Sequence, residues 1–178
     1  KKFNKAAEIL EMVKLSNFSI NNFPNKDIKK LGEHFETDVS GLFSDIWVEM
    51  SDDIYFDQTY DFTYRRFKKN NIDPFDLFSG KTIVDAGCGS GKFSAALAKF
   101  GAKKVIGIDI GKKGIEFAKQ QSKKFNLNDK LEFFEGSLLN IPLEDSTVDM
   151  VWSNGVIHHT SDYDKCVEEF ARITKHEG

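Results

Sequence analysis

Residues 82–91 read TIVDAGCGSG, a short apolar run that leads directly into a glycine-rich turn. Because glycine has no side chain, such a turn bends sharply and lets the backbone approach a ligand closely. Apolar residues at helical spacing follow over about residues 92–100, and Gly101 ends the helix that they predict. This helix would point its free N–H groups and its positive end at the turn, so we predict a ligand site there.

The chain beyond this turn alternates short β-rich runs with helical patterns. The elements we expect are strands at 105–108, 131–134 and 148–152, a helix at 111–126, and a helix at 163–174 with Val167, Phe170, Ala171 and Ile173 on its inner side. Such alternation predicts an α/β fold, in which βαβ units build a parallel sheet with flanking helices. Ligands of these sheets bind beyond the carboxyl ends of the strands.

The first 79 residues differ in texture and are rich in Phe, Asn, Lys and Asp. Apolar spacing there predicts helices at about 4–15, 27–35 and 42–50, and residues 70–80, with Pro74 and Gly80, are interpreted as a connector. The aromatic residues from Tyr55 to Phe67 are interpreted as core packing rather than as ligand contacts.

Charge and cysteine content narrow the class of protein. The 178 residues carry a formal net charge of −3, which argues against a nucleic-acid partner because phosphate binding needs a basic surface. The two cysteines, Cys88 and Cys166, have no CxxC spacing and indicate neither a disulfide framework nor a zinc site. Apolar runs are too short for a membrane span, so we predict a reduced, cytoplasmic protein without a membrane partner.

The spacing of the glycines helps to identify the ligand. A dinucleotide fingerprint has its third glycine five residues after the first, but position 92 is Lys92 and the third glycine comes one residue early, at Gly91. The turn is preceded by Asp85, whose carboxylate would repel a pyrophosphate and attract an ammonium group. The pattern therefore favours a ligand with a cationic amino-acid portion over a dinucleotide.

Asp109 ends the second predicted strand, 20 residues after Gly89. A carboxylate at this position can accept hydrogen bonds from both hydroxyls of a ribose. The alternative is a helix N-cap, since a helix is predicted to begin near Gly111. We favour ribose binding, because strand, turn and acid have compatible spacing.

Taken together, these stretches resemble a known family. The runs IVDAGCGSGKFSAALAKFGAKKVIGIDI, FFEGSLLNIPLEDSTVDMVWSNGVIHHTSD and EEFARITKHEG are similar to the class I, Rossmann-like S-adenosylmethionine-dependent methyltransferases, in particular to the subgroup that includes quinone-biosynthesis and other small-molecule enzymes. The resemblance covers about residues 81–178. It implies S-adenosylmethionine as cofactor, whose methionine portion carries the ammonium group that Asp85 would attract.

The resemblance also implies roles for individual residues. The turn residues Asp85, Gly87, Cys88, Gly89 and Gly91 would hold the methionine portion, Asp109 the ribose, Ile110 the adenine face, Ser137 and Leu138 the adenine edge, and Asn154, Gly155 and Val156 the region of the reactive methyl group. Many family members carry an acid at the position of Ser137. An uncharged serine there accepts a weaker hydrogen bond, so we expect weaker binding of the adenine amino group.

No catalytic residue is identified, and His158 and His159 are the candidates for a general base because imidazole titrates near neutral pH. The resemblance favours a structural or pocket-lining role for both. No metal is expected, since adjacent side chains diverge and no further ligand motif accompanies them. Arg65 or Arg66 could reach the methionine carboxylate, although a solvated helix face is an equally good interpretation.

The predicted organisation is a helical N-terminal cap at 1–79 and an S-adenosylmethionine-binding domain at 80–178. The family's sheet has seven strands, so the domain is expected to be truncated after its fourth strand and the helix that follows. We predict that N-terminal helices or a second copy of the chain, in a homo-oligomer, cover the exposed edge of that strand.

The predicted function is methyl transfer to a small-molecule acceptor, which the sequence does not identify. The alternatives are a non-catalytic S-adenosylmethionine-binding or interaction module, since such a fragment can bind cofactor and be inactive, and a nicotinamide-dependent dehydrogenase.

Overall fold

The computed structural model describes residues 51–176, all of which belong to one compact unit, Gly32–Gly178. The helices expected at 4–15, 27–35 and 42–50 lie outside the described residues. The division of the chain at residue 79 stays a prediction.

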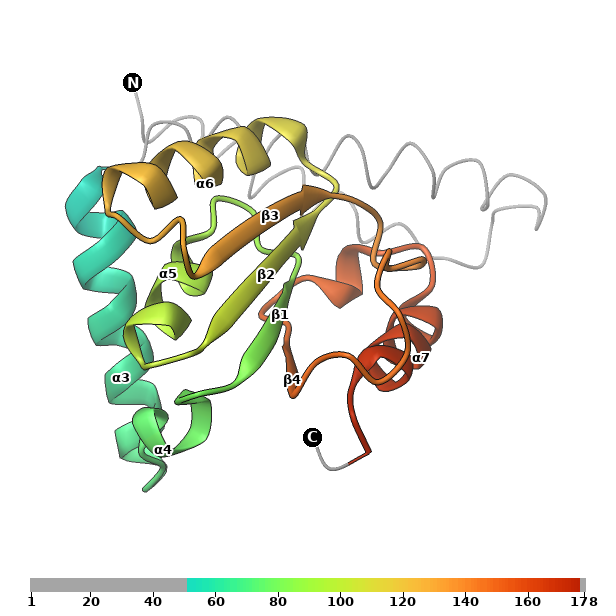
Figure 1. Cartoon of the computed structure of the whole chain (residues 1–178), viewed down its shortest axis with the longest axis horizontal. Coiled ribbons are helices and arrows are strands. Elements are labelled where there is room, and N and C mark those ends of the chain that lie inside the picture. Colours follow the sequence, from blue (N-terminus) through green and yellow to red (C-terminus); the bar gives the residue numbers. More distant parts are fainter. Residues whose placement is uncertain (1–50, 177–178) are drawn as a thin grey trace, which may run out of the picture. The chain divides into compact units, whose positions relative to one another are not determined.

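A parallel sheet with the strand order β3-β2-β1-β4 forms the centre of this unit (Figure 1). Its strands are β1 (Thr82–Ala86), β2 (Lys104–Asp109), β3 (Leu131–Glu135) and β4 (Met150–Trp152). Val84 on β1 pairs with Ile106 on one side and with Val151 on the other. The predicted α/β fold is confirmed, although β4 is shorter than expected because Val148 forms only an isolated bridge to Thr174.

Helices follow the first two strands as expected. They are α5 (Lys92–Lys99) and α6 (Lys112–Lys124), and α7 (Tyr163–Ile173) follows β4. Gly101 adopts a left-handed φ of 96° just beyond α5, which agrees with its predicted role in ending that helix. Upstream of the sheet lie a π-helix, η2 (Asp53–Gln58), which continues into α3 (Thr59–Lys69), and a short helix, α4 (Pro74–Phe78).

The interpretation of 70–80 as a connector was wrong in one respect, because it contains α4. Pro74 occupies the first helical turn, where its missing N–H costs nothing, and the Asp73 carboxylate caps the helix by accepting a 2.9 Å hydrogen bond from the N–H of Phe75. A proline that interrupts a helix elsewhere starts one here.

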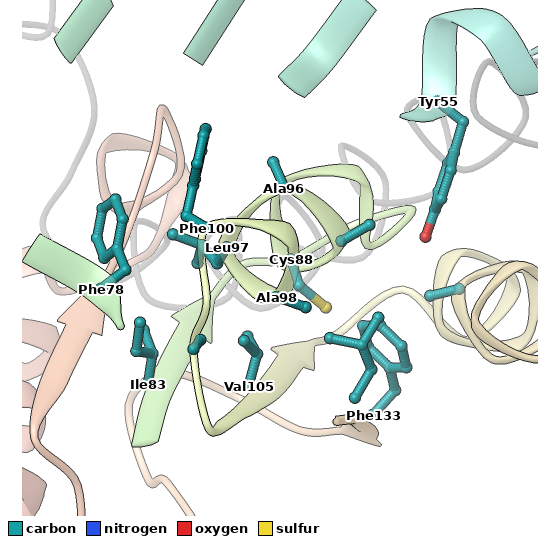
Figure 2. Close-up of a cluster of buried hydrophobic side chains, with 14 of the residues drawn as sticks. Tyr55, Phe78, Ile83, Cys88, Ala96, Leu97, Ala98, Phe100, Val105 and Phe133 are labelled. Atoms are coloured by element: carbon teal, nitrogen blue, oxygen red, sulfur yellow. The ribbon is translucent and has the colours of Figure 1, made fainter. Parts of the chain in front are cut away.

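One face of the sheet is covered by α5, α6 and the segment from η2 to α4, and buried side chains from these elements form a single cluster (Figures 1 and 2). The aromatic segment contributes to it: Tyr55 is buried and stacks on Phe125, and Phe67 packs against Phe78. Core packing is therefore confirmed for most of this segment, since Phe56, Tyr60 and Tyr64 pack against the same cluster. Phe62 differs, because its side chain is exposed on α3.

The opposite face is covered by α7 and by the segment between β3 and β4. Leu138 and Ile141 of that segment pack with Ile108 of β2 and with Cys166 and Ile173 of α7. The predicted inner side of the last helix was partly wrong. Its buried residues are Cys166, Glu169 and Ile173, with Phe170 partly buried, whereas Val167 and Ala171 are exposed. Apolar spacing failed here because the inward position is occupied by a glutamate.

Among the described residues, β4 pairs only with β1, so its other side is an edge of the sheet. Each of its three residues is only partly buried. The expected cover from N-terminal helices or a second copy stays a prediction.

Candidate functional site

The glycine turn lies at the carboxyl end of β1 and is anchored to the neighbouring strand. The N–H groups of Gly87 and Cys88 both donate to the carbonyl oxygen of Ile108, at 2.7 and 3.1 Å. Gly91 is the N-terminal cap of α5 and adopts a φ of 77°. The turn is therefore held in a conformation that sends the chain from β1 directly into α5.

Two of its glycines are required for different reasons. A Cβ atom at Gly91 would lie 2.8 Å from the ring of Phe133, so this glycine lets the turn pack against β3 and α6. A Cβ atom at Gly87 would lie 2.3 Å from the side chain of Val156, which follows β4. Gly91 thus faces the core, whereas Gly87 faces the chain segment that comes over from β4.

Asp85 is the penultimate residue of β1 and is almost completely buried. Its carboxylate accepts a hydrogen bond of 2.5 Å from the Ser94 hydroxyl of α5. Burial, only partly opposed by this hydrogen bond, raises the pKa of Asp85 to about 7, and the nearby Asp109 charge adds to the rise. A cationic group placed beside Asp85 would restore its full negative charge.

Asp109 ends β2 and joins the turn to the start of α6. One carboxylate oxygen accepts from the N–H of Gly89 at 2.8 Å, and the other accepts from the N–H of Gly111 at 2.7 Å. Burial raises the pKa of Asp109, and the two amide bonds counteract that rise. The alternative interpretation of Asp109 as a helix N-cap was wrong, because the N-cap of α6 is Gly111 and α6 has no side-chain cap hydrogen bond. The Asp109 carboxylate instead fixes the turn and the residue before α6 through these two amide bonds. Each oxygen keeps capacity for a second donor, so ribose binding is compatible with them and stays a prediction.

The residues predicted to meet an adenine lie just beyond β2 and β3. Ile110 exposes an apolar side chain, 37% accessible, at the end of β2. The Ser137 hydroxyl accepts a hydrogen bond of 3.2 Å from the N–H of Leu139. The side chain of Leu138 is buried under the sheet, which leaves mainly its backbone for a ligand.

The segment after β4 reaches the glycine turn, as the topology requires. β2 and β4 flank β1 on opposite sides, so the chain order reverses at β1, the usual ligand position in such sheets. The Ser153 hydroxyl donates to the carbonyl oxygen of Ala86 at 3.1 Å, and Val156 lies against Gly87. Asn154 and Gly155 lie between these two contacts and are therefore beside the turn.

His158 and His159 lie on a short 3-10 helix, η3 (Ile157–His159), directly after this segment. Their ring centroids are 3.9 Å apart. Burial and the neighbouring His158 lower the pKa of His159, which keeps its imidazole neutral and able to accept a proton near pH 7. Within residues 51–176, no group of three or more His, Cys, Asp or Glu side chains could hold a metal ion.

The arginines of α3 lie on its exposed face. Arg65 is 3.6 Å from Asp61, one turn earlier, and both side chains are largely accessible. Arg66 is exposed as well. This arrangement agrees with the solvated-face interpretation.

Sequence reasoning missed Ser94, Glu169 and Arg172. The signal for Ser94 was a hydroxyl on the buried face of an otherwise apolar helix. The spacing of Glu169 and Arg172, three residues apart on a predicted helix, was the only local signal for their ion pair. Their contacts to residues about 30 positions away gave none. In the part of the chain that the structure describes, no helix has the length and apolar character needed to cross a membrane.

Comparison with known proteins places these residues in a family context. A family described as a methyltransferase domain matches residues 84–178, more than half of the chain. The chain is 29% identical over 114 residues to the demethylmenaquinone methyltransferase of Oceanobacillus iheyensis, which covers 63% of this chain and 48% of that protein. It is 44% identical over 63 residues to the ribosomal protein L11 methyltransferase of Tolumonas auensis, covering 35% of this chain and 21% of that protein.

A solved structure shows the same fold. The crystal structure of a putative S-adenosylmethionine-dependent methyltransferase from Methanococcus maripaludis aligns with a TM-score of 0.59 at 26% identity, covering 79% of this chain and 60% of that chain. The chain thus spans about half of the length of the first curated relative, and less of the second.

Proposed function

The chain belongs to the methyltransferase-domain family, and from this premise we propose that it transfers a methyl group from S-adenosylmethionine to a small-molecule acceptor. S-adenosylmethionine is the family's cofactor. The observation that carries the proposal is a pair of buried carboxylates, Asp85 and Asp109, at the carboxyl ends of adjacent strands beside the glycine turn.

The residues of this site fit the cofactor. Burial raises the pKa of the Asp85 carboxyl group to about 7, and the α-ammonium group of the methionine portion would supply a positive partner that lowers it again. Asp109 keeps acceptor capacity for the ribose hydroxyls after bonding to Gly89 and Gly111. Ile110, exposed at the end of β2, offers an apolar surface for the adenine ring.

A small-molecule acceptor is favoured by how far the similarities extend. The likeness to the demethylmenaquinone methyltransferase covers 63% of this chain, whereas that to the ribosomal protein L11 methyltransferase covers 35%. The longer match is to the protein whose name states a quinone as its substrate. A protein acceptor is the competing proposal, and a peptide substrate belongs in the assay.

The proposed mechanism assigns binding and orientation to this chain. When bound, S-adenosylmethionine would supply a methyl group on a sulfonium, from which a neutral thioether leaves readily in an in-line displacement. Asp85 would hold the methionine portion and Asp109 the ribose, on either side of the sulfur, and so would orient the methyl group toward an acceptor. Asn154, Gly155 and Val156, beside the turn, would surround the acceptor. For an acceptor that must lose a proton, the neutral His159 imidazole is the candidate base.

The test is calorimetric titration of the full chain with S-adenosylhomocysteine and, separately, with NAD. We expect binding of the first ligand only. Asp109→Ala is expected to weaken binding by about 1–3 kcal/mol, the loss of charge-assisted hydrogen bonds from a buried site. Asp129→Ala is the matched control and should leave the affinity unchanged. Asp129 is exposed and lies before the amino end of β3, whereas the proposed site lies at the carboxyl ends of the strands.

Turnover is then measured with a methyl-labelled donor and panels of small molecules and peptides. Binding of NAD without S-adenosylhomocysteine would overturn the cofactor assignment. Cofactor binding without transfer to any acceptor would favour a non-catalytic binding module. Unchanged affinity in a folded Asp109→Ala variant would remove Asp109 from the site.

A further inference from the structure

Arg172, near the end of α7, holds the segment between β3 and β4 with both edges of its guanidinium group. On one edge it donates to the carbonyl oxygens of Ile141 at 2.9 Å and Leu143 at 2.7 Å. On another it forms a paired contact with the Glu169 carboxylate, at 2.9 and 2.8 Å. Asp145 accepts a further bond of 2.8 Å at the exposed rim.

Glu169 binds the same segment from its buried side. Its carboxylate is buried and accepts a hydrogen bond of 2.8 Å from the N–H of Ile141. Ile141 is therefore held through its N–H by Glu169 and through its carbonyl by Arg172. The hydrogen bonds from Arg172 lower the pKa of Glu169, so the carboxylate stays ionised and the ion pair stays intact at neutral pH.

The segment held in this way includes the two residues proposed to meet the adenine edge. It is anchored at its start by the N–H of Gly136, which donates to the carbonyl oxygen of Asp109 at 3.0 Å. The next anchor is Ile141. Ser137 and Leu138 lie between these two fixed points, in a stretch with neither helix nor strand. Their position therefore depends on both anchors.

We propose that Arg172 is a positioning residue for adenine recognition, which acts by holding Ile141 and Leu143 and thereby placing Ser137 and Leu138 beside Ile110. This inference rests on the proposed function. A planar guanidinium fork suits the role, because it binds a carboxylate and two carbonyls in one fixed geometry that a lysine ammonium group does not reproduce. The side-chain hydrogen bonds of Arg172 go to Ile141, Leu143, Asp145 and Glu169, none of which is assigned to the cofactor.

The test compares two ligands that differ only at the adenine edge: S-adenosylhomocysteine and S-inosylhomocysteine, in which an oxygen replaces the amino group. In Arg172→Lys we expect the affinity for S-adenosylhomocysteine to fall by about tenfold, the scale of one weakened hydrogen bond at the adenine edge. The affinity for S-inosylhomocysteine is expected to change less, so the discrimination between the two ligands shrinks. Arg65→Lys is the matched control, because Arg65 is exposed on α3, and it should change neither affinity.

The outcomes separate positioning from general stabilisation. Equal losses for both ligands, or unchanged affinities in a variant shown to be folded by circular dichroism, would overturn the inference. If Arg172→Lys does not fold, Glu169→Gln removes the charge but keeps the shape, and the same loss of discrimination is expected. Wild-type protein that binds neither ligand overturns the proposed function instead, and this result is known before any variant is made.

Discussion

The two sides of β1 differ in how deeply their residues are buried and in how many hydrogen bonds hold them to the glycine turn. On the β2 side, Asp85 and Asp109 are 2% and 8% exposed, and the glycine turn is tied to β2 by two hydrogen bonds to Ile108. On the β4 side, the strand has three partly buried residues, and the segment after it is held to the turn by one Ser153 hydroxyl bond and by packing of Val156.

This contrast agrees with the proposed reaction, in which the β2 side binds the cofactor and the β4 side faces the acceptor. The cofactor is the same throughout the family, so its side of the site profits from a rigid, preformed arrangement. The acceptor differs between relatives, and variable loops on a rigid scaffold are the usual place for such differences. We expect substitutions on the two sides to differ accordingly.

The largest expected difference is between two glycines with almost the same positive φ angle. Gly91 and Gly155 have φ of 77° and 75°, but a Cβ atom at Gly91 would meet Phe133 and Ala118 within 2.9 Å, whereas at Gly155 it would meet nothing within 4 Å. Both alanine variants incur the left-handed backbone penalty of about 1–2 kcal/mol. Gly91→Ala adds overpacking, so its total loss of unfolding free energy should reach about 3 kcal/mol.

Chemical denaturation of both variants measures this difference. Because the two φ angles are nearly equal, the gap in unfolding free energy between the variants reports mainly packing. Equal destabilisation of the two variants would mean that the turn is not packed more tightly than the segment after β4.

The same contrast explains which features sequence reasoning could predict. The turn, β1, β2 and α5 follow from local patterns, since glycine spacing and apolar periodicity act over a few residues. The inward position of Glu169 could not be predicted, because the N–H of Ile141 meets its carboxylate only after α7 has packed on the β3–β4 segment. Within the site, the approach of Val156 to Gly87 depends on strand order, which no local pattern encodes.

A smaller effect on stability is expected from one carboxylate on each side, because folding shifts the pKa values of the two groups in opposite directions. Burial raises the pKa of Asp85 to about 7. The hydrogen bonds from Lys175 and from the N–H of Thr82 lower the pKa of Asp149, which lies beside β4. The folded state therefore binds the Asp85 proton more tightly than the unfolded state does, and its contribution to stability is lost as pH rises from about 4 to 7. The contribution of Asp149 is instead present above about pH 4 and lost as pH falls further.

Unfolding free energies of Asp85→Asn and Asp149→Asn from pH 3 to 8 test this opposition. Asp85→Asn mimics the protonated acid, so relative to wild type it should gain about 1 kcal/mol or more between pH 5 and 8. Asp149→Asn should lose at most about 1 kcal/mol at pH 7, because its ion pair is partly exposed, and the loss should vanish in acid. Parallel profiles for the two variants would contradict the assigned environments.

The smallest expected effect concerns two tyrosine hydroxyls. Tyr55 is 1% exposed, and its hydroxyl, which Figure 2 shows directed into the buried cluster, has no hydrogen-bond partner among the described residues. Tyr163, on α7 of the β4 side, is 60% exposed. An unpaired buried hydroxyl lowers stability, so Tyr55→Phe should raise the unfolding free energy by about 1 kcal/mol. Tyr163→Phe should stay within about 0.5 kcal/mol of wild type, since water solvates its hydroxyl in both states. A destabilised Tyr55→Phe variant would contradict the assignment of an unpaired, buried hydroxyl to Tyr55.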